Sequence, residues 1–253
     1  IDNTMYEKTV LAMREDPFFF KNQAMQQIGF HNVALVCDKM CSAASLSCIL
    51  DEVGKHYGIE QKNLYYTYGW SGLLSSTRRY EEARALFIGL EKEVQRLKDL
   101  GYCPRVRILG YSHGGNVSLN LAAIHHNEFK KSKLTVDELV LIGTPIINDS
   151  DFLINDKMFK RVLNLYSMCD RVQPLDFFAP GQFFSDRIFR PRKGFKLPSK
   201  LTQVQVKVTK CTKRARLSPK KLALSSNLNT KSVVSGRTRL LRDISPGHAE
   251  LWF

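Results

Sequence analysis

The sequence has no hydrophobic run that approaches the roughly 20 residues needed to span a membrane. Cysteine is sparse as well. The 6 cysteines lack the spacing of a zinc site, and we interpret them mostly as buried free thiols. No basic-then-apolar signal segment opens the chain, although its start at Ile1 rather than Met leaves an upstream leader open. These absences disfavour a helical membrane protein and a zinc protein, and we expect neither a metal nor an organic cofactor.

Acidic residues are nearly absent from one C-terminal stretch. Residues 186–243 hold 17 Lys or Arg and only two acids, whereas the other 195 residues hold 21 basic and 22 acidic side chains. The net charge of +14 therefore belongs to this stretch alone. The rest of the chain has an ordinary charge balance, and 253 residues that are 43% hydrophobic suit one α/β domain with a sizeable core.

Predicted strands alternate with predicted helices along the chain. Apolar runs predict strands at 32–37, 64–68, 105–109, 138–143, 162–167 and 203–208, and helical spacing predicts helices at 45–57, 78–100 and 114–124. This alternation indicates an α/β fold with a mostly parallel central sheet and helices on both faces. Residues 1–28 predict a helical lead-in to that domain.

The pentapeptide Gly110-Tyr111-Ser112-His113-Gly114 matches the Gly-x-Ser-x-Gly pattern of a nucleophile elbow. The elbow is a sharp strand-to-helix turn that presents a serine hydroxyl. Its glycines are expected because a β-carbon at either flanking position would collide with the neighbouring strand or helix. The motif stands between a predicted strand and a predicted helix, as an elbow requires. The alternative is a serine in an ordinary glycine-rich turn.

A serine nucleophile needs a histidine base and a third group that orients the base. Such groups gather beyond the carboxyl ends of parallel strands. Asp170 follows the predicted strand 162–167 and is our candidate acid, while Asp151 and Asp176 are rivals that lie farther from a strand end. His248 is the only histidine after Asp170. The predicted triad therefore runs in the order Ser, Asp, His.

These motifs resemble those of the α/β-hydrolase superfamily, and most closely its small bacterial lipases and esterases. The order of strands, loops and helices from Asn32 to Ile124 matches that family. Tyr-Ser-x-x-Asp at 166–170 and Gly-His-x-x-Leu at 247–251 are similar to its acid and base segments. The resemblance implies a hydrolase domain over 29–253, with a basic, lid-like insertion at about 178–243.

The resemblance also implies an oxyanion hole with two backbone donors. One is the N–H of His113, and the other is the N–H of Lys39, with Met40 as the neighbouring choice. The chain departs from the family here, because Cys37-Asp38 replaces the usual His-Gly. The Asp38 carboxylate would oppose a developing oxyanion unless it points away.

Trp70 and Tyr111 are the predicted substrate-binding residues. Trp70 follows a predicted strand at its carboxyl end, so it lines an acyl pocket or, equally, packs against the sheet edge. Tyr111 directly precedes the predicted nucleophile.

Together these features predict a serine hydrolase that cleaves carboxylic esters through an acyl-enzyme, acting on a small-molecule or lipid ester. The alternative is a catalytically weak or inactive hydrolase scaffold that binds anionic membranes or polyanions through its basic segment. Aromatic and basic residues alternate between 183 and 195, which suits a lipid surface. A nucleic acid is the less favoured partner, and an ordinary solvated loop is the other explanation for this segment.

Overall fold

The computed structural model describes residues 28–36, 42–59, 62–73, 75–170, 185–211, 231–234 and 237–244. The predicted helical lead-in, apart from its last residue, lies outside these described residues. So do three residues of the predicted site or its rivals: Lys39, His248 and Asp176.

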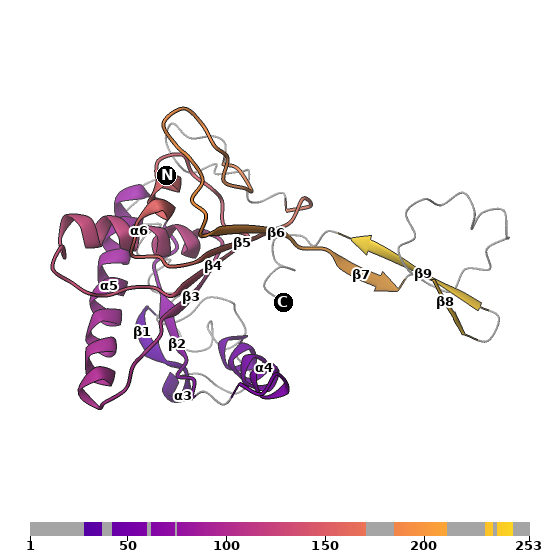
Figure 1. Ribbon diagram of the computed structural model, residues 1–253, viewed down its shortest axis with the longest axis horizontal. Coiled ribbons are helices and arrows are strands. Elements are labelled where there is room, and N and C mark those ends of the chain that lie inside the picture. The colour runs from indigo at the N-terminus through magenta and orange to yellow at the C-terminus, as the bar shows by residue number, and fades with distance from the viewer. Residues whose placement is uncertain are drawn as a thin grey trace.

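Four parallel strands form the central sheet in the order β3-β4-β5-β6 (Figure 1). They are β3 (Arg107–Tyr111), β4 (Glu138–Ile142), β5 (Val162–Tyr166) and β6 (Leu201–Gln205). Every neighbouring pair is parallel, so all four carboxyl ends meet at one edge of the sheet. The α/β class is thereby confirmed. The near-continuous apolar run of β4 is typical of a strand that is buried on both faces.

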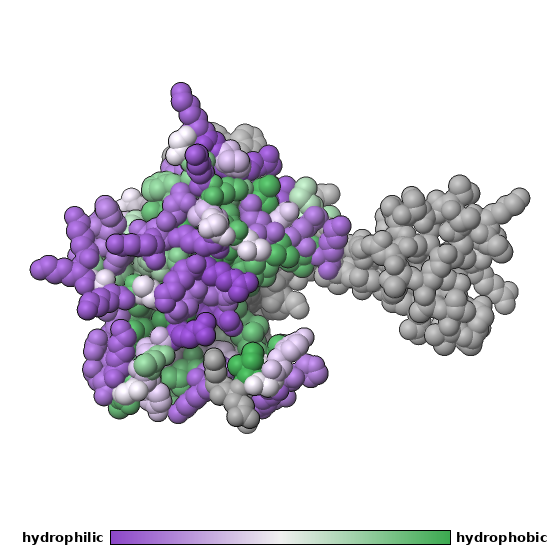
Figure 2. Space-filling view, in the orientation of Figure 1, coloured by the Kyte–Doolittle hydropathy of each residue, from purple (hydrophilic) through white to green (hydrophobic). Residues whose placement is uncertain are grey.

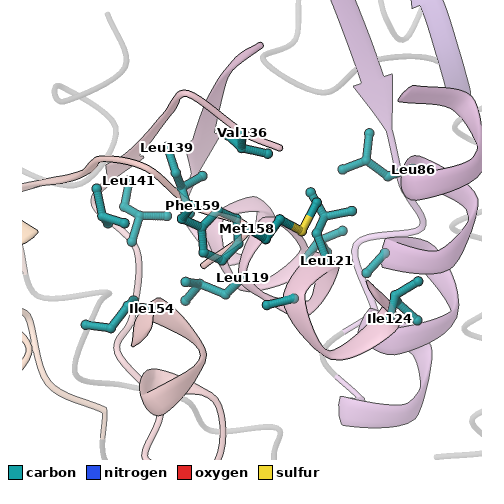
Figure 3. Close-up of a cluster of buried hydrophobic side chains, with 14 of the residues drawn as sticks. Leu86, Leu119, Leu121, Ile124, Val136, Leu139, Leu141, Ile154, Met158 and Phe159 are labelled. Carbon is teal, nitrogen blue, oxygen red and sulfur yellow. The ribbon is translucent and has the colours of Figure 1, made fainter. Parts of the chain in front are cut away.

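Two long helices, α5 (Ser76–Asp99) and α6 (His113–Asn127), pack together beside this sheet (Figure 1). The Ser75 side chain accepts a hydrogen bond from Arg78 N and caps the start of α5. Apolar residues at helical spacing on both helices enter one core with β4 and the segment that precedes β5. Figure 3 shows ten of them labelled: Leu86, Leu119, Leu121, Ile124, Val136, Leu139, Leu141, Ile154, Met158 and Phe159.

The predicted strand at 32–37 is wrong. The strand β1 occupies Gly29–Asn32, and Val33–Val36 form the short helix α3. A short apolar run suits a buried strand or a helix equally, so periodicity alone could not decide between them. The Asn32 Oδ1 atom accepts a hydrogen bond from Ala34 N at 2.9 Å, which is typical of a residue that starts a helix.

The strand β1 also lies in a different sheet from the one expected. It pairs antiparallel with β2 (Tyr66–Gly69), and the two form a separate two-stranded sheet. The parallel sheet is therefore less extensive than the sequence predicted. The helix α4 (Ser42–His56) forms where a helix was expected, but its apolar residues Ile49 and Val53 are about half exposed.

Part of the predicted basic insertion packs into the domain. Phe189 and Phe195 are 1% and 4% exposed and join the hydrophobic core. Interpreting these two aromatic residues as a lipid-docking surface is wrong, because their rings are not accessible. The segment then enters the sheet as β6, which begins two residues before the predicted strand.

Three further strands form an antiparallel sheet in the order β7-β9-β8. They are β7 (Val208–Cys211), β8 (Lys231–Val234) and β9 (Arg237–Ile244). Figure 1 shows this sheet to one side of the central sheet, beyond the end of β6. The predicted strand 203–208 thus corresponds to two strands, since β6 ends at Gln205 and β7 begins at Val208.

The described surface carries mixed side chains. Hydrophilic residues are interspersed with smaller apolar areas on the face that Figure 2 shows. No helix in the described segments is both long and apolar enough to cross a membrane. Cys48, Cys103 and Cys169 are free and exposed, so the interpretation of the cysteines as buried thiols is wrong for these three.

Candidate active site

Ser112 lies between the end of β3 and the start of α6. Its backbone has φ 50° and ψ −134°, and it is the only non-glycine residue with a positive φ in the part of the chain that the structure describes. Residues other than glycine adopt such a conformation only when the surrounding structure imposes it. The Ser112 N–H donates to the Ile142 carbonyl at 2.9 Å, and its own carbonyl accepts from Gly115 N at 3.0 Å. The predicted strand, serine and helix are confirmed in that order.

The crowding around this turn differs from the prediction. A β-carbon at Gly110 would lie 2.7 Å from the Gly115 Cα, and a β-carbon at Gly115 would lie 2.0 Å from Thr144 Oγ1. At Gly114, by contrast, the nearest atom is Trp70 Nε1 at an ordinary 3.7 Å. The structure therefore requires glycine at 110 and 115. The expectation of a collision at Gly114 is wrong, because that position faces the side of Trp70 rather than the sheet.

His113 is the first residue of α6. The first four N–H groups of a helix have no carbonyl partner within it and lie at the positive end of its dipole. The His113 N–H therefore belongs to a helix end that suits a developing negative charge. The predicted second donor, Lys39, and its neighbours Asp38 and Met40 lie outside the described residues.

Asp170 lies on a turn directly after β5. Its side chain is fully buried, and its N–H donates to the Ser167 carbonyl at 3.3 Å. The Ser167 Oγ accepts from Cys169 N at 3.2 Å, which tightens the same turn. Only β4 separates β5 from β3 in the parallel sheet, so Asp170 and Ser112 leave the same edge of the sheet. The predicted base, His248, lies outside the described residues.

Tyr111 interacts electrostatically with Asp170 and directly precedes Ser112. Two causes together raise the pKa of Tyr111 to about 12: chiefly its burial and, in addition, the negative charge of Asp170. The Asp170 carboxylate is therefore near enough to Tyr111 to oppose ionisation of its phenol. Because Tyr111 directly precedes Ser112, the predicted acid lies on the same side of the molecule as the predicted nucleophile.

Trp70 lies directly after β2, beside the first turn of α6. The turn that carries it is anchored by Glu82 of α5, whose Oε1 accepts from Ser71 N at 3.1 Å. The Tyr68 hydroxyl also donates to the Glu82 carbonyl at 2.7 Å. Trp70 packs against the hydrophobic core while its indole nitrogen approaches the elbow. The two expectations for Trp70, core packing and proximity to the site, are therefore compatible.

The rival acid Asp151, and two histidines that precede Asp170 in the chain, have contacts of their own. Asp151 is 2% exposed and forms an ion pair with Arg192, so it serves the scaffold. His31 Nε2 lies 2.7 Å from the Ile28 carbonyl, and His125 Nε2 lies 3.1 Å from the Ser132 carbonyl.

Three residues at this site were not found by sequence reasoning. Gly115 and Thr144 form the tight contact behind the elbow, and the Arg187 guanidinium donates from Nε and Nη2 to the Asp170 carbonyl at 2.8 and 2.5 Å. The Gly114-Gly115 doublet was the available signal for the first contact. Nothing local to Arg187 indicates its partner, which lies 17 residues away.

The described residues thus bring Ser112, Tyr111, Trp70 and Asp170 to one region. Within them, no group of three or more His, Cys, Asp or Glu side chains could hold a metal ion. Comparisons of this chain with protein-family models, with curated proteins and with solved structures find no match.

Proposed function

We propose that the protein is a serine hydrolase that cleaves carboxylic esters, with Ser112 as the nucleophile. The observation that carries this proposal is the positive φ of Ser112 between a parallel strand and a helix. This conformation raises a serine hydroxyl above the carboxyl edge of a sheet, which is the geometry of a nucleophile elbow. A fold that maintains such strain is typical of a functional position.

The positions of the acid and the glycines support the same proposal. Asp170 and Ser112 follow strands that are separated by a single strand, with a shared carboxyl edge. The proposed hydrolase fold places the base after the next strand, β6, and His248 is the candidate. In this proposal the span between β6 and His248, which includes β7 to β9, forms the lid-like insertion.

The proposed reaction proceeds through an acyl-enzyme. His248 takes the Ser112 Oγ proton as that oxygen bonds to the ester carbonyl carbon, and Asp170 stabilises the imidazolium. The N–H groups of His113 and Lys39 hold the oxyanion. The ester C–O bond then breaks, and His248 returns the proton to the departing alkoxide, which leaves as the alcohol. Water then attacks the acyl-enzyme through the same steps, with His248 again taking and returning a proton. This releases the carboxylic acid product and restores the Ser112 hydroxyl.

Trp70 and Tyr111 are the proposed substrate contacts. Trp70 presents an aromatic side chain beside the first turn of α6, and Tyr111 has a phenol that stays protonated because its pKa is about 12. An apolar wall with one neutral hydroxyl suits an uncharged acyl or alcohol group, as in small-molecule or lipid esters.

Labelling with a fluorescent fluorophosphonate tests the nucleophile. The wild-type protein should be labelled, and Ser112→Ala should lose the label because it lacks the attacking oxygen. Ser118→Ala is the matched control. Ser118 lies on the same helix, is 3% exposed and donates only to the Gly114 carbonyl at 2.9 Å. Equal labelling of wild type and Ser112→Ala would show that the assignment is wrong. Aryl esters of increasing acyl length then define the substrate.

A second candidate function is binding to an anionic membrane through the sheet β7-β9-β8. These strands contain five basic residues and one acid: Lys210, Lys231, Arg237, Arg239, Arg242 and Asp243. In the register of β7 and β9, Lys210 pairs with Arg242. Co-sedimentation with phosphatidylserine vesicles, compared with phosphatidylcholine vesicles, tests this function. Binding should be lost at high salt and retained in Ser112→Ala.

A further inference from the structure

The segment 185–189, here named the strap, contacts the chain just beyond β4 and the middle of β5. Asp186 exchanges two backbone hydrogen bonds with Ile146, at 2.8 and 3.0 Å, just beyond β4. The Arg187 carbonyl accepts from Asn164 Nδ2 of β5 at 3.1 Å. The strap is therefore bound to two neighbouring strands of the parallel sheet.

The far end of the strap is fixed by β6. The Gln203 side chain accepts a hydrogen bond from Phe189 N at 2.7 Å and donates one to the Phe189 carbonyl at 3.0 Å. Its amide thus pairs with both backbone groups of Phe189, as a neighbouring strand would. The Phe189 ring is 1% exposed and lies in the core. A segment with a buried anchor and paired backbone groups holds its other side chains in defined positions.

Arg187 uses this rigidity to hold the turn that carries Asp170. Two of its guanidinium nitrogens, Nε and Nη2, converge on the Asp170 carbonyl at 2.8 and 2.5 Å. A two-donor fork restrains its acceptor in direction as well as distance. Arg187 therefore restrains the residue that bears the proposed acid.

The same contact brings the guanidinium charge to the backbone of a residue whose carboxyl group is buried. Asp170 is fully buried, and an ionised carboxylate in such a position is costly without a neighbouring cation or donors. The other charged groups of the strap, Asp186 and Arg190, form their own exposed ion pair at 3.7 Å. From β3, the Tyr111 phenol faces Asp170 and stays neutral, and Cys169 adjoins it on the turn.

We propose that Arg187 is the positioning residue of the acid, holding the Asp170 turn in place and keeping its carboxylate ionised. The catalytic part of this inference rests on the proposed hydrolase function. Removing the guanidinium charge should raise the pKa of the Asp170 carboxyl, because the protonated form is favoured when a nearby cation is lost. In the proposed triad the base adjoins Asp170, so the pKa of the base should rise as well.

The test compares wild type with Arg187→Met, Arg187→Lys and Arg190→Met. The first readout is the Asp170 carboxyl titration, followed by ¹³C NMR, which requires no activity. Arg187→Met should titrate at higher pH than wild type by about half a unit or more. Arg187→Lys should stay close to wild type, and Arg190→Met should match it. Thermal unfolding checks that each variant is folded.

The second readout is hydrolysis of a short-chain aryl ester across pH. Arg187→Met should lower kcat by about 10- to 100-fold through misplacement of the acid. It should also move the acidic limb of kcat/KM to higher pH, because activity requires the deprotonated base. A merely structural role would lower the rate at every pH without moving this limb.

The outcomes separate the two proposals. An unchanged Asp170 titration in folded Arg187→Met overturns the role of Arg187, whatever the activity. Equal titration shifts in Arg187→Met and Arg190→Met overturn it too, since any nearby arginine would then suffice. Failure of Ser112 labelling in the wild type overturns the hydrolase function alone, and the NMR titration still decides whether Arg187 controls Asp170.

Discussion

Two adjacent glycines of α6 should respond oppositely to substitution by alanine. In an exposed helix interior, Gly→Ala is favourable by about 1 kcal/mol because alanine loses less backbone entropy. At Gly114 the new methyl would meet only Trp70 Nε1, at 3.7 Å. We therefore expect Gly114→Ala to leave the free energy of unfolding unchanged or to raise it by up to about 1 kcal/mol.

At Gly115 the same methyl would meet Thr144 at three points, 2.0 Å from Oγ1, 2.6 Å from Cγ2 and 2.9 Å from Cβ. Thr144 is fully buried, and rotating its side chain cannot move its Cβ. Overpacking of this kind costs about 1 to 3 kcal/mol, and contacts this short place the cost at the upper end. After the helical gain, Gly115→Ala should lower the free energy of unfolding by about 2 kcal/mol.

Urea denaturation monitored by circular dichroism measures both variants, with the double variant Gly115→Ala/Thr144→Ala as a further test. Removing Oγ1 and Cγ2 relieves two of the three contacts, so the double-mutant cycle should show a coupling of about 1 kcal/mol or more. Gly115→Ala should also slow fluorophosphonate labelling, because α6 must move away from Thr144 and Ser112 moves with it. Equal unfolding free energies for the two single variants would refute the reasoning.

Two further predictions concern buried ionisable groups. Because the pKa of Tyr111 is raised from 10.0 to about 12 in the folded protein, unfolding should become easier as pH rises between these values. Urea denaturation at several pH values measures this effect. In Tyr111→Phe the free energy of unfolding should fall less steeply between these pH values, and the same dependence on pH as in wild type would contradict the assigned pKa. Asp151→Asn breaks the ion pair with Arg192 at a position 2% exposed and should cost about 2 kcal/mol of unfolding free energy. A loss as small as that of exposed Glu52→Gln would contradict the buried pairing.

Much of the fold could be predicted because its main elements carry strong local signals. The strand β4 is a continuous apolar run, and α5 has an amphipathic pattern with a serine cap, so both appear close to their expected bounds. The segment 33–36 carried no such signal. Its four apolar residues suit a strand or a helix equally. The segment is helical because β1 pairs with β2 and ends at Asn32, whose side chain caps the helix.

The candidate site likewise has a part that the sequence predicted and a part that it did not. Ser112 was found because its motif and flanking elements are contiguous, and Asp170 because it follows a strand that is evident from its sequence. The surroundings of both residues were not predictable, since they come from distant segments. Phe189 illustrates the difficulty: its aromatic and basic neighbours suggested a surface, yet the Gln203 amide and the core hold it inside.

By itself, then, the sequence determined the α/β class, the strand–serine–helix order at Ser112 and the concentration of positive charge near the C-terminus. These follow from neighbouring residues, through apolar periodicity, glycine placement and composition. Only the tertiary structure decided that glycine is required at 115 rather than 114, because Thr144 comes from another strand end. Likewise, it alone placed Arg187 on Asp170, because that contact depends on a strap held by segments far apart along the chain.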